Sequence, residues 1–76
     1  MEYSWDERKR RENLKRHGLD FVDAPKVYEH PGKMTINSPH RGEDRKIDIA
    51  PIGDTLLVLT LVYAARGPEV RIISFR

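Results

Sequence analysis

The sequence predicts an α+β domain in which two N-terminal helices pack on an antiparallel sheet, in the order β-α-α-β-β-β-β. Three features of the chain support this prediction. A polar N-terminal segment has residues typical of a capped helix, the second half contains apolar segments of strand length, and short links with glycine or proline join those segments. Links of hairpin length place successive strands antiparallel, and helices can then cover one face of the sheet.

The chain has 76 residues, and we expect one domain over residues 1–76. It has no cysteine, which excludes disulfides and thiolate metal sites and is typical of a reducing compartment, so we expect a cytoplasmic protein. The N-terminus is charged from Glu2 and lacks the apolar stretch of a signal peptide. The longest apolar segment, LLVLTLVYAA at residues 56–65, is too short to cross a bilayer as a helix.

The first predicted helix covers residues 6–17. Asp6 is a candidate N-cap, and Ser4 with Glu7 offers a capping box as the alternative. Gly18 is expected to end the helix, because glycine adopts the left-handed conformation of a helix C-terminus at the least cost.

This helix is almost wholly polar, and Leu14 is its one plainly apolar residue. We expect Leu14 and Trp5 to dock on the sheet. Lys9, Asn13 and His17 follow one another at intervals of four and therefore lie in a stripe on one helix face. The polarity of the helix is explained if one side faces water and another faces a polar site.

Short elements flank this helix. A strand is expected over residues 3–5 and a second helix over residues 21–28, with Asp20 as its N-cap candidate. Pro25 must lie in the first turn of that helix, where its missing N–H costs little. The sequence HPG at residues 30–32 ends it.

The second half is expected to form four strands, over residues 33–37, 45–52, 55–64 and 69–75. A loop over residues 38–44 follows the first of them. Tight turns are expected at Gly53-Asp54 and at residues 66–68. Pro51 favours a strand end or an edge, because proline cannot donate to the ladder.

Alternation along the strands assigns their faces. Ile47, Ile49 and Ile52 are expected to face inwards. One face of the last strand is expected to hold Glu69, Arg71, Ile73 and Phe75. The strand over residues 55–64 is apolar at both parities, so both faces of the sheet need cover, and loops or a partner must supply it where the helices do not.

Basic residues are clustered although the net charge is only +2. One group lies in the first helix, at Arg8, Lys9, Arg10, Arg11, Lys15 and Arg16, and a second group comprises Arg66, Arg71 and Arg76. Clustered positive charge on a small domain is typical of a surface that binds RNA or DNA. A solvated helix face is the alternative.

His17 is the candidate for proton transfer, because histidine is the side chain that titrates near neutral pH. The alternative is that it only satisfies the last carbonyls of the helix. Arg71 keeps its charge when buried and therefore needs an acid such as Glu69 or an anionic ligand. His17, His30 and His40 lack the spacing of metal ligands, so we expect no metal site.

Arginine, lysine, histidine and glutamate together suit metal-independent RNA cleavage by the 2′-hydroxyl. A base takes the 2′ proton, cations stabilise the phosphorane, and an acid protonates the leaving oxygen.

Two motifs resemble the BrnT toxins. The first is W-D-x-x-K-x-x-x-N-x-x-[KR]-H-G-x-x-F over residues 5–21, and the second is R-G-x-x-x-R-I-I-S-x-R over residues 66–76. The resemblance implies a RelE-like fold and a ribonuclease that halts translation. We expect no cofactor. It also implies a BrnA antitoxin that silences the toxin in a complex of two toxins and two antitoxins, and operator DNA bound only through that complex.

The resemblance also assigns the site residues, with RNA as substrate. It implies His17 as general base or acid, Arg66 and Arg71 as phosphate or transition-state contacts, and Glu69 as a proton carrier or a tether for Arg71. The expected contacts to RNA are Lys9, Asn13, Arg16, Ser74 and Arg76. The alternatives are a nucleic-acid-binding module without chemistry and a plain protein-interaction domain.

The chain departs from the family pattern at two places. Ala65 stands where relatives carry an acidic residue before the arginine that matches Arg66, and Ile49-Ala50 replaces an Ile-Gly pair. Relatives also continue past the arginine that matches Arg76 into a basic helical tail.

Overall fold

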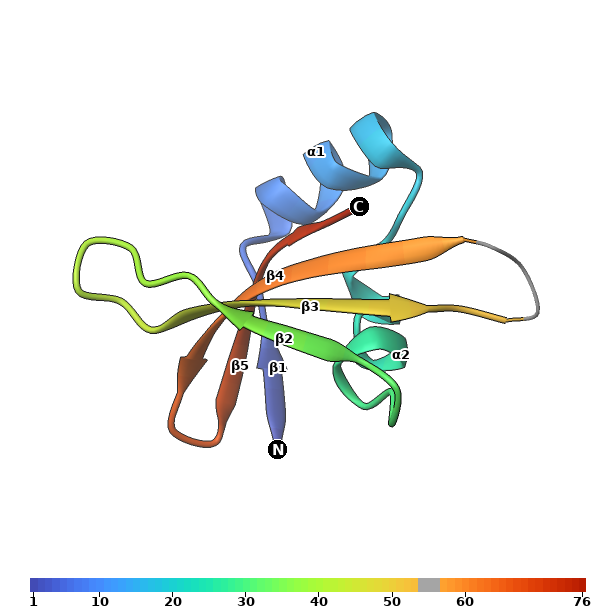
Figure 1. Ribbon diagram of the computed structural model, residues 1–76. Helices are drawn as coiled ribbons and strands as arrows, with labels where there is room; N and C mark the ends of the chain where they lie inside the picture. The colour runs from blue at the N-terminus through green and yellow to red at the C-terminus, as the bar shows by residue number, and fades with distance from the viewer. Residues whose placement is uncertain (54–56) are drawn as a thin grey trace.

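The computed structural model describes residues 1–53 and 57–76, and it confirms the predicted α+β class (Figure 1). The elements are β1 (Glu2–Ser4), α1 (Glu7–His17), the 3₁₀ turn η1 (Phe21–Asp23), α2 (Pro25–Tyr28), β2 (Met34–Asn37), β3 (Arg45–Pro51), β4 (Val58–Arg66) and β5 (Glu69–Phe75). Asp54 of the predicted turn and residues 55–56 of the predicted strand lie outside the described residues. None of the helices in the described ranges is long and apolar enough to cross a membrane.

The five strands form one sheet in the order β1-β5-β4-β3-β2. The hairpin-linked strands β2 to β5 are antiparallel neighbours, as expected. The prediction of a wholly antiparallel sheet is wrong for β1, which pairs in parallel with β5. The hairpin rule does not apply to this pair, because the rest of the chain separates the two strands in sequence.

Local signals set the ends of the helices. The Asp6 carboxylate accepts hydrogen bonds from the backbone N–H groups of Arg8 and Lys9, at 2.9 and 3.2 Å, so Asp6 is the N-cap of α1. Gly18 ends α1 with a φ of 71°, in the left-handed region. The expected second helix is divided into η1 and α2, and Pro25 occupies the first position of α2 as predicted.

The hydrophobic core lies between the sheet and the η1–α2 segment. That segment contributes Phe21, Ala24 and Val27, and the sheet contributes Ala50, Leu61, Tyr63, Val70, Ile72 and Phe75. Trp5 packs against this core with its ring edge-on to Phe21. Neither η1 nor α2 covers the opposite face of the sheet, which we call the open face.

The faces of β3 are the reverse of the prediction for Ile47 and Ile49. Asp48 and Ala50 are buried, whereas Ile47 and Ile49 lie half-buried on the open face; Ile52 packs against the core as expected. The register is possible because the fully buried Asp48 is satisfied: its carboxylate lies 2.7 Å from Lys33 Nζ and accepts hydrogen bonds from the hydroxyls of Thr35 and Tyr63.

A β-bulge changes the faces of β5. Tyr63 pairs with Ile72, but Leu61 pairs with Phe75, so β5 contains one extra residue at this point. Phe75 therefore turns to the core face with Val70 and Ile72, and the predicted grouping of Phe75 with Arg71 is wrong.

Helix α1 lies beside the C-terminal end of β5, at the edge of the sheet (Figure 1). Its buried residue is Asn13 rather than Leu14, which is 40% exposed, so the predicted docking of Leu14 is wrong. Strand β1 pairs with β5 only as far as Arg71. Further along β5, the Asn13 amide takes the place of a neighbouring strand. It accepts a hydrogen bond from Phe75 N–H at 3.1 Å and donates to the Phe75 and Leu19 carbonyls at 2.7 and 3.0 Å. A polar helix thus suits this place, because it satisfies the backbone of a strand edge.

Candidate active site

Two adjoining hollows run along α1 where it meets β5. The first, the His17 hollow, has a volume of about 210 Å³ and is lined by Lys9, Glu12, Asn13, Arg16, His17, Ile73, Ser74 and Arg76. The second, the Arg71 hollow, has a volume of about 180 Å³ and is lined by Asp6, Lys9, Glu43, Arg45, Arg66, Arg71, Ile72 and Ile73. Lys9 and Ile73 line both, so the two hollows form one continuous cationic surface.

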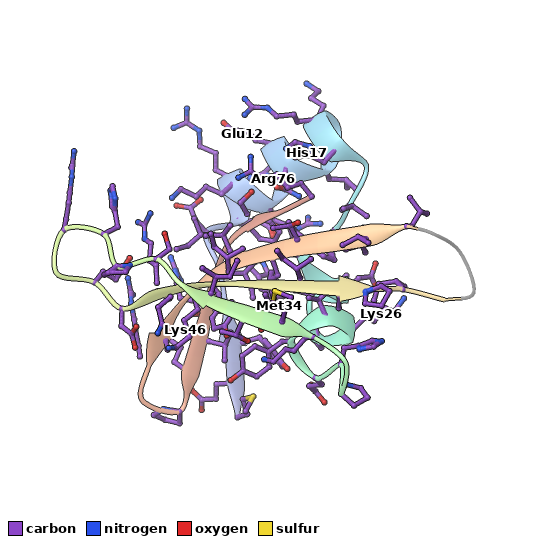
Figure 2. The ribbon with its side chains drawn as sticks, viewed as in Figure 1. Glu12, His17, Lys26, Met34, Lys46 and Arg76 are labelled. Atoms are coloured by element: carbon purple, nitrogen blue, oxygen red, sulfur yellow. The ribbon has the colours of Figure 1, made fainter. Side chains whose placement is uncertain are left out.

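The helical period builds the His17 hollow. Lys9, Asn13 and His17 form the expected stripe, and all three line this hollow. Figure 2 shows His17 and Arg76 close together beside α1, with Glu12 near them. Arg76 is held there by its backbone, whose N–H and C=O pair with Thr60 at 2.9 and 2.5 Å.

A carboxylate from the loop after β2 organises the Arg71 hollow. Glu43 accepts from Arg66 Nη2 at 2.6 Å and from Arg45 Nε at 2.8 Å. These hydrogen bonds, that from Arg45 first, lower the pKa of Glu43 to about 2. The backbone of Glu43 pairs with that of His40 in both directions, which fixes the loop. Glu43 is therefore ionised at neutral pH and holds two arginine side chains in place.

Several cations that line the hollows have no carboxylate partner. Within residues 1–53 and 57–76, no ion pair forms at Lys9, Arg16, Arg71 or Arg76. Two other basic side chains of α1 are paired, Arg8 with Glu12 and Arg10 with Glu7 and Asp20. Uncompensated positive charge in a concave surface raises the local concentration of anions.

Glu69 does not act as the partner of Arg71. Its carboxylate instead accepts a hydrogen bond from Ser4 Oγ at 2.7 Å, and Glu69 lines neither hollow. Arg71 is half-buried on the open face, in register with Ser4 on one side and Ala64 on the other. A guanidinium in this position keeps its charge, and an anionic ligand in the hollow would compensate it.

The predicted site residues come together in two groups rather than in one shared hollow. His17, Arg16, Asn13, Ser74 and Arg76 line the first hollow, and Arg66 and Arg71 line the second. Lys9 lies in both, about 12 Å from His17 along the helix axis. The hollows are also lined by polar residues that were not predicted from the sequence as site residues, namely Asp6, Glu12, Glu43 and Arg45.

The described residues contain no group of three or more histidine, aspartate or glutamate side chains that could hold a metal ion. The chain also has no cysteine. The donor groups around the hollows are thus mainly nitrogen cations, which bind anionic groups directly.

Residues 5–76 match the family described as "Ribonuclease toxin, BrnT, of type II toxin-antitoxin system". The chain belongs to the BrnT family. The match begins at Trp5, so every residue that lines the two hollows lies within it. A search of curated proteins found no match.

Family membership confirms the resemblance that the two sequence motifs indicated. BrnT proteins are ribonuclease toxins of type II toxin–antitoxin systems, and a type II toxin implies an antitoxin partner. The cationic surface along α1 and β5 is the part of this BrnT chain that suits a polyanionic substrate.

Proposed function

We propose that this BrnT protein is an endoribonuclease that cleaves RNA without a metal ion, and that its active site comprises the His17 and Arg71 hollows. The observation that carries the proposal is the set of cations without carboxylate partners, Lys9, Arg16, Arg71 and Arg76, beside His17 on one continuous surface. The phosphates of an RNA strand laid along α1 would meet these cations in succession.

The proposed reaction is attack by the ribose 2′-oxygen on the adjacent phosphorus. A base removes the 2′ proton, the new P–O bond forms, and the bond from phosphorus to the 5′-oxygen breaks as an acid protonates that oxygen. The products are a 2′,3′-cyclic phosphate and a free 5′-hydroxyl. Lys9, which lines both hollows and has no ion pair among the described residues, stabilises the negative charge that develops on the phosphorane beside His17. Arg71, in the adjoining hollow, holds a neighbouring phosphate of the same strand.

His17 is the proposed proton carrier, since it is exposed and lines the first hollow. Glu12 lines the same hollow and is the second candidate, although its carboxylate lies 3.2 Å from Arg8. Glu43 is unsuited to be a base, because a carboxyl with a pKa of about 2 binds a proton too weakly near neutral pH. We propose that Glu43 instead holds the Arg66 side chain in position.

The remaining predicted contacts differ in whether the polar groups of their side chains already have hydrogen-bond partners. Arg16, Ser74 and Arg76 are proposed contacts to the RNA backbone. Asn13 makes three hydrogen bonds to backbone groups, so we propose a structural role for it instead. Glu69 is proposed only to hold Ser4 at the junction of β1 and β5.

The wider biology is proposed from family membership. We propose a RelE-like arrangement of the sheet, inhibition of translation in the cytoplasm, and neutralisation by a BrnA-type antitoxin. An assembly of two toxins with two antitoxins, which binds operator DNA through the antitoxin, belongs to the same proposal.

A module that binds RNA without cleaving it is the second candidate, because the same unpaired cations would support binding alone. Incubation of RNA with the purified free protein in EDTA separates the two. Cleavage is expected, and His17→Ala or Lys9→Ala should each reduce its rate by roughly 10²–10⁴-fold. Lys26→Ala is the matched control, since Lys26 lies on α2, pairs with Asp23 and lines neither hollow. Salt-sensitive binding with intact RNA would favour the second candidate.

A further inference from the structure

The open face of the sheet carries an apolar patch that η1 and α2 leave uncovered. In the register of β2, β3 and β4, Ile36 lies opposite Ile47 and Ile47 opposite Val62. Met34 lies opposite Ile49 in the neighbouring row, and Val58 follows near the end of β3. The open-face patch therefore comprises Met34, Ile36, Ile47, Ile49, Val58 and Val62.

This patch is accessible in the free chain. Met34 is 64% exposed, Val58 54% and Ile36 45%. Ile47 and Ile49 are half-buried in the same rows. A contiguous apolar surface on a small soluble domain marks a site of interaction with another molecule.

The border of the patch is positively charged. The next row along the same face places Arg45 opposite Ala64 and Ala64 opposite Arg71. Arg76 pairs with Thr60, which lies opposite Ile49. Arg71 and Arg76 have no ion pair in the part of the chain that the structure describes, and both line the hollows of the proposed active site. The patch and the active site are therefore continuous.

We infer that the open-face patch is the docking surface for an amphipathic, acidic segment of the antitoxin, an inference that rests on the proposed function. The apolar side chains of the segment cover Met34, Ile36 and Val58, and its carboxylates pair with Arg71 and Arg76. The carboxylates thereby occupy the positions that RNA phosphates need, so one contact both binds the antitoxin and blocks cleavage.

Other occupants fit this surface less well. RNA stacks its bases on aromatic side chains, whereas the patch consists of methionine, isoleucine and valine. A second copy of the chain would bring the same cationic border against itself in a two-fold contact, and like charges oppose that arrangement. An acidic peptide matches both the apolar centre and the charged border.

The test uses the full chain and the purified cognate antitoxin, with affinity measured by calorimetry and cleavage measured on RNA. Ile36→Glu should weaken binding of the antitoxin by about 100-fold, because it puts an acid in an apolar contact with an acidic segment. Ile36→Lys should weaken it less. Val22→Glu is the matched control, since Val22 is 55% exposed on η1 and away from the open face, and it should bind like the wild type.

Cleavage by Ile36→Glu without antitoxin should equal that of the wild type, because Ile36 lines neither hollow, and added antitoxin should no longer inhibit it. Wild-type affinity of Ile36→Glu would overturn the inference. So would a stable dimer of the free chain that Ile36→Glu dissociates, since the patch would then belong to a second copy. The calorimetry decides this inference even if the wild type fails to cleave RNA, a failure that would count against the proposed function alone.

Discussion

Replacing Asn13 with alanine tests whether a polar residue on α1 stabilises the edge of the sheet. The Asn13 amide pairs with both backbone groups of Phe75 and also donates to the Leu19 carbonyl. Asn13 is only 8% exposed, so alanine would leave the Phe75 N–H and C=O without their partners in a nearly buried place. The Asn13→Ala chain should therefore unfold more easily.

The size of the effect follows from the groups left unsatisfied. Each buried backbone group without a partner lowers the free energy of unfolding by about 1–3 kcal/mol. The better helix propensity of alanine offsets about 0.5 kcal/mol of this loss. A loss of about 3 kcal/mol in the free energy of unfolding is expected. That is a large share of the stability of a domain of this length, which is about 4–11 kcal/mol at the usual value per residue.

The assay is urea unfolding followed by the fluorescence of Trp5, which packs edge-on to Phe21 in the core. The midpoint should fall by about 2 M or more. Asn37→Ala is the control of the same chemistry, because Asn37 is exposed and its amide oxygen accepts an exposed hydrogen bond from Lys46 Nζ. A midpoint for Asn13→Ala within about 0.5 M of the control would show that Asn13 does not stabilise the edge of the sheet.

Two further predictions concern charge. Arg45 and Arg66 lower the pKa of Glu43 from 4.5 to about 2, so the stabilisation by its carboxylate is fully present above about pH 4.5 and is lost as the pH falls towards 2. Glu43→Gln should therefore show a smaller fall in Tm between pH 5 and pH 2 than the wild type, and equal falls would contradict the pairing. Arg76→Ala should reduce the slope of log affinity for RNA against log salt concentration by about 0.7, the value for one phosphate contact to a single strand, whereas Lys26→Ala should leave the slope unchanged.

Local rules were sufficient to predict much of the fold. The Asp6 and Gly18 caps bounded α1, and the Gly67-Pro68 link defined the β4–β5 hairpin, because each signal acts over only a few residues. Strand faces were less predictable. Asp48 looked like a solvent-facing residue by its charge, and only distant partners such as Lys33 make its burial possible.

The candidate site was likewise predictable only where local rules apply. The stripe of Lys9 and His17 followed from the helical period alone, and the structure places both in one hollow. The proximity of Arg71 to Lys9 depends on how β5 passes α1, which motifs could suggest only through a family resemblance. Glu43 lay in a loop without a local pattern, so no sequence signal connected it to Arg66.

The ends of the RNA fragments made by the free protein in EDTA distinguish attack by the 2′-oxygen from metal-dependent hydrolysis. We expect fragments with a 2′,3′-cyclic phosphate and a free 5′-hydroxyl, formed by the wild type and by Lys26→Ala but strongly diminished for His17→Ala and Lys9→Ala. Fragments with 5′-phosphate ends that disappear when EDTA is added, or a full rate of cleavage by both hollow variants, would contradict the proposed mechanism.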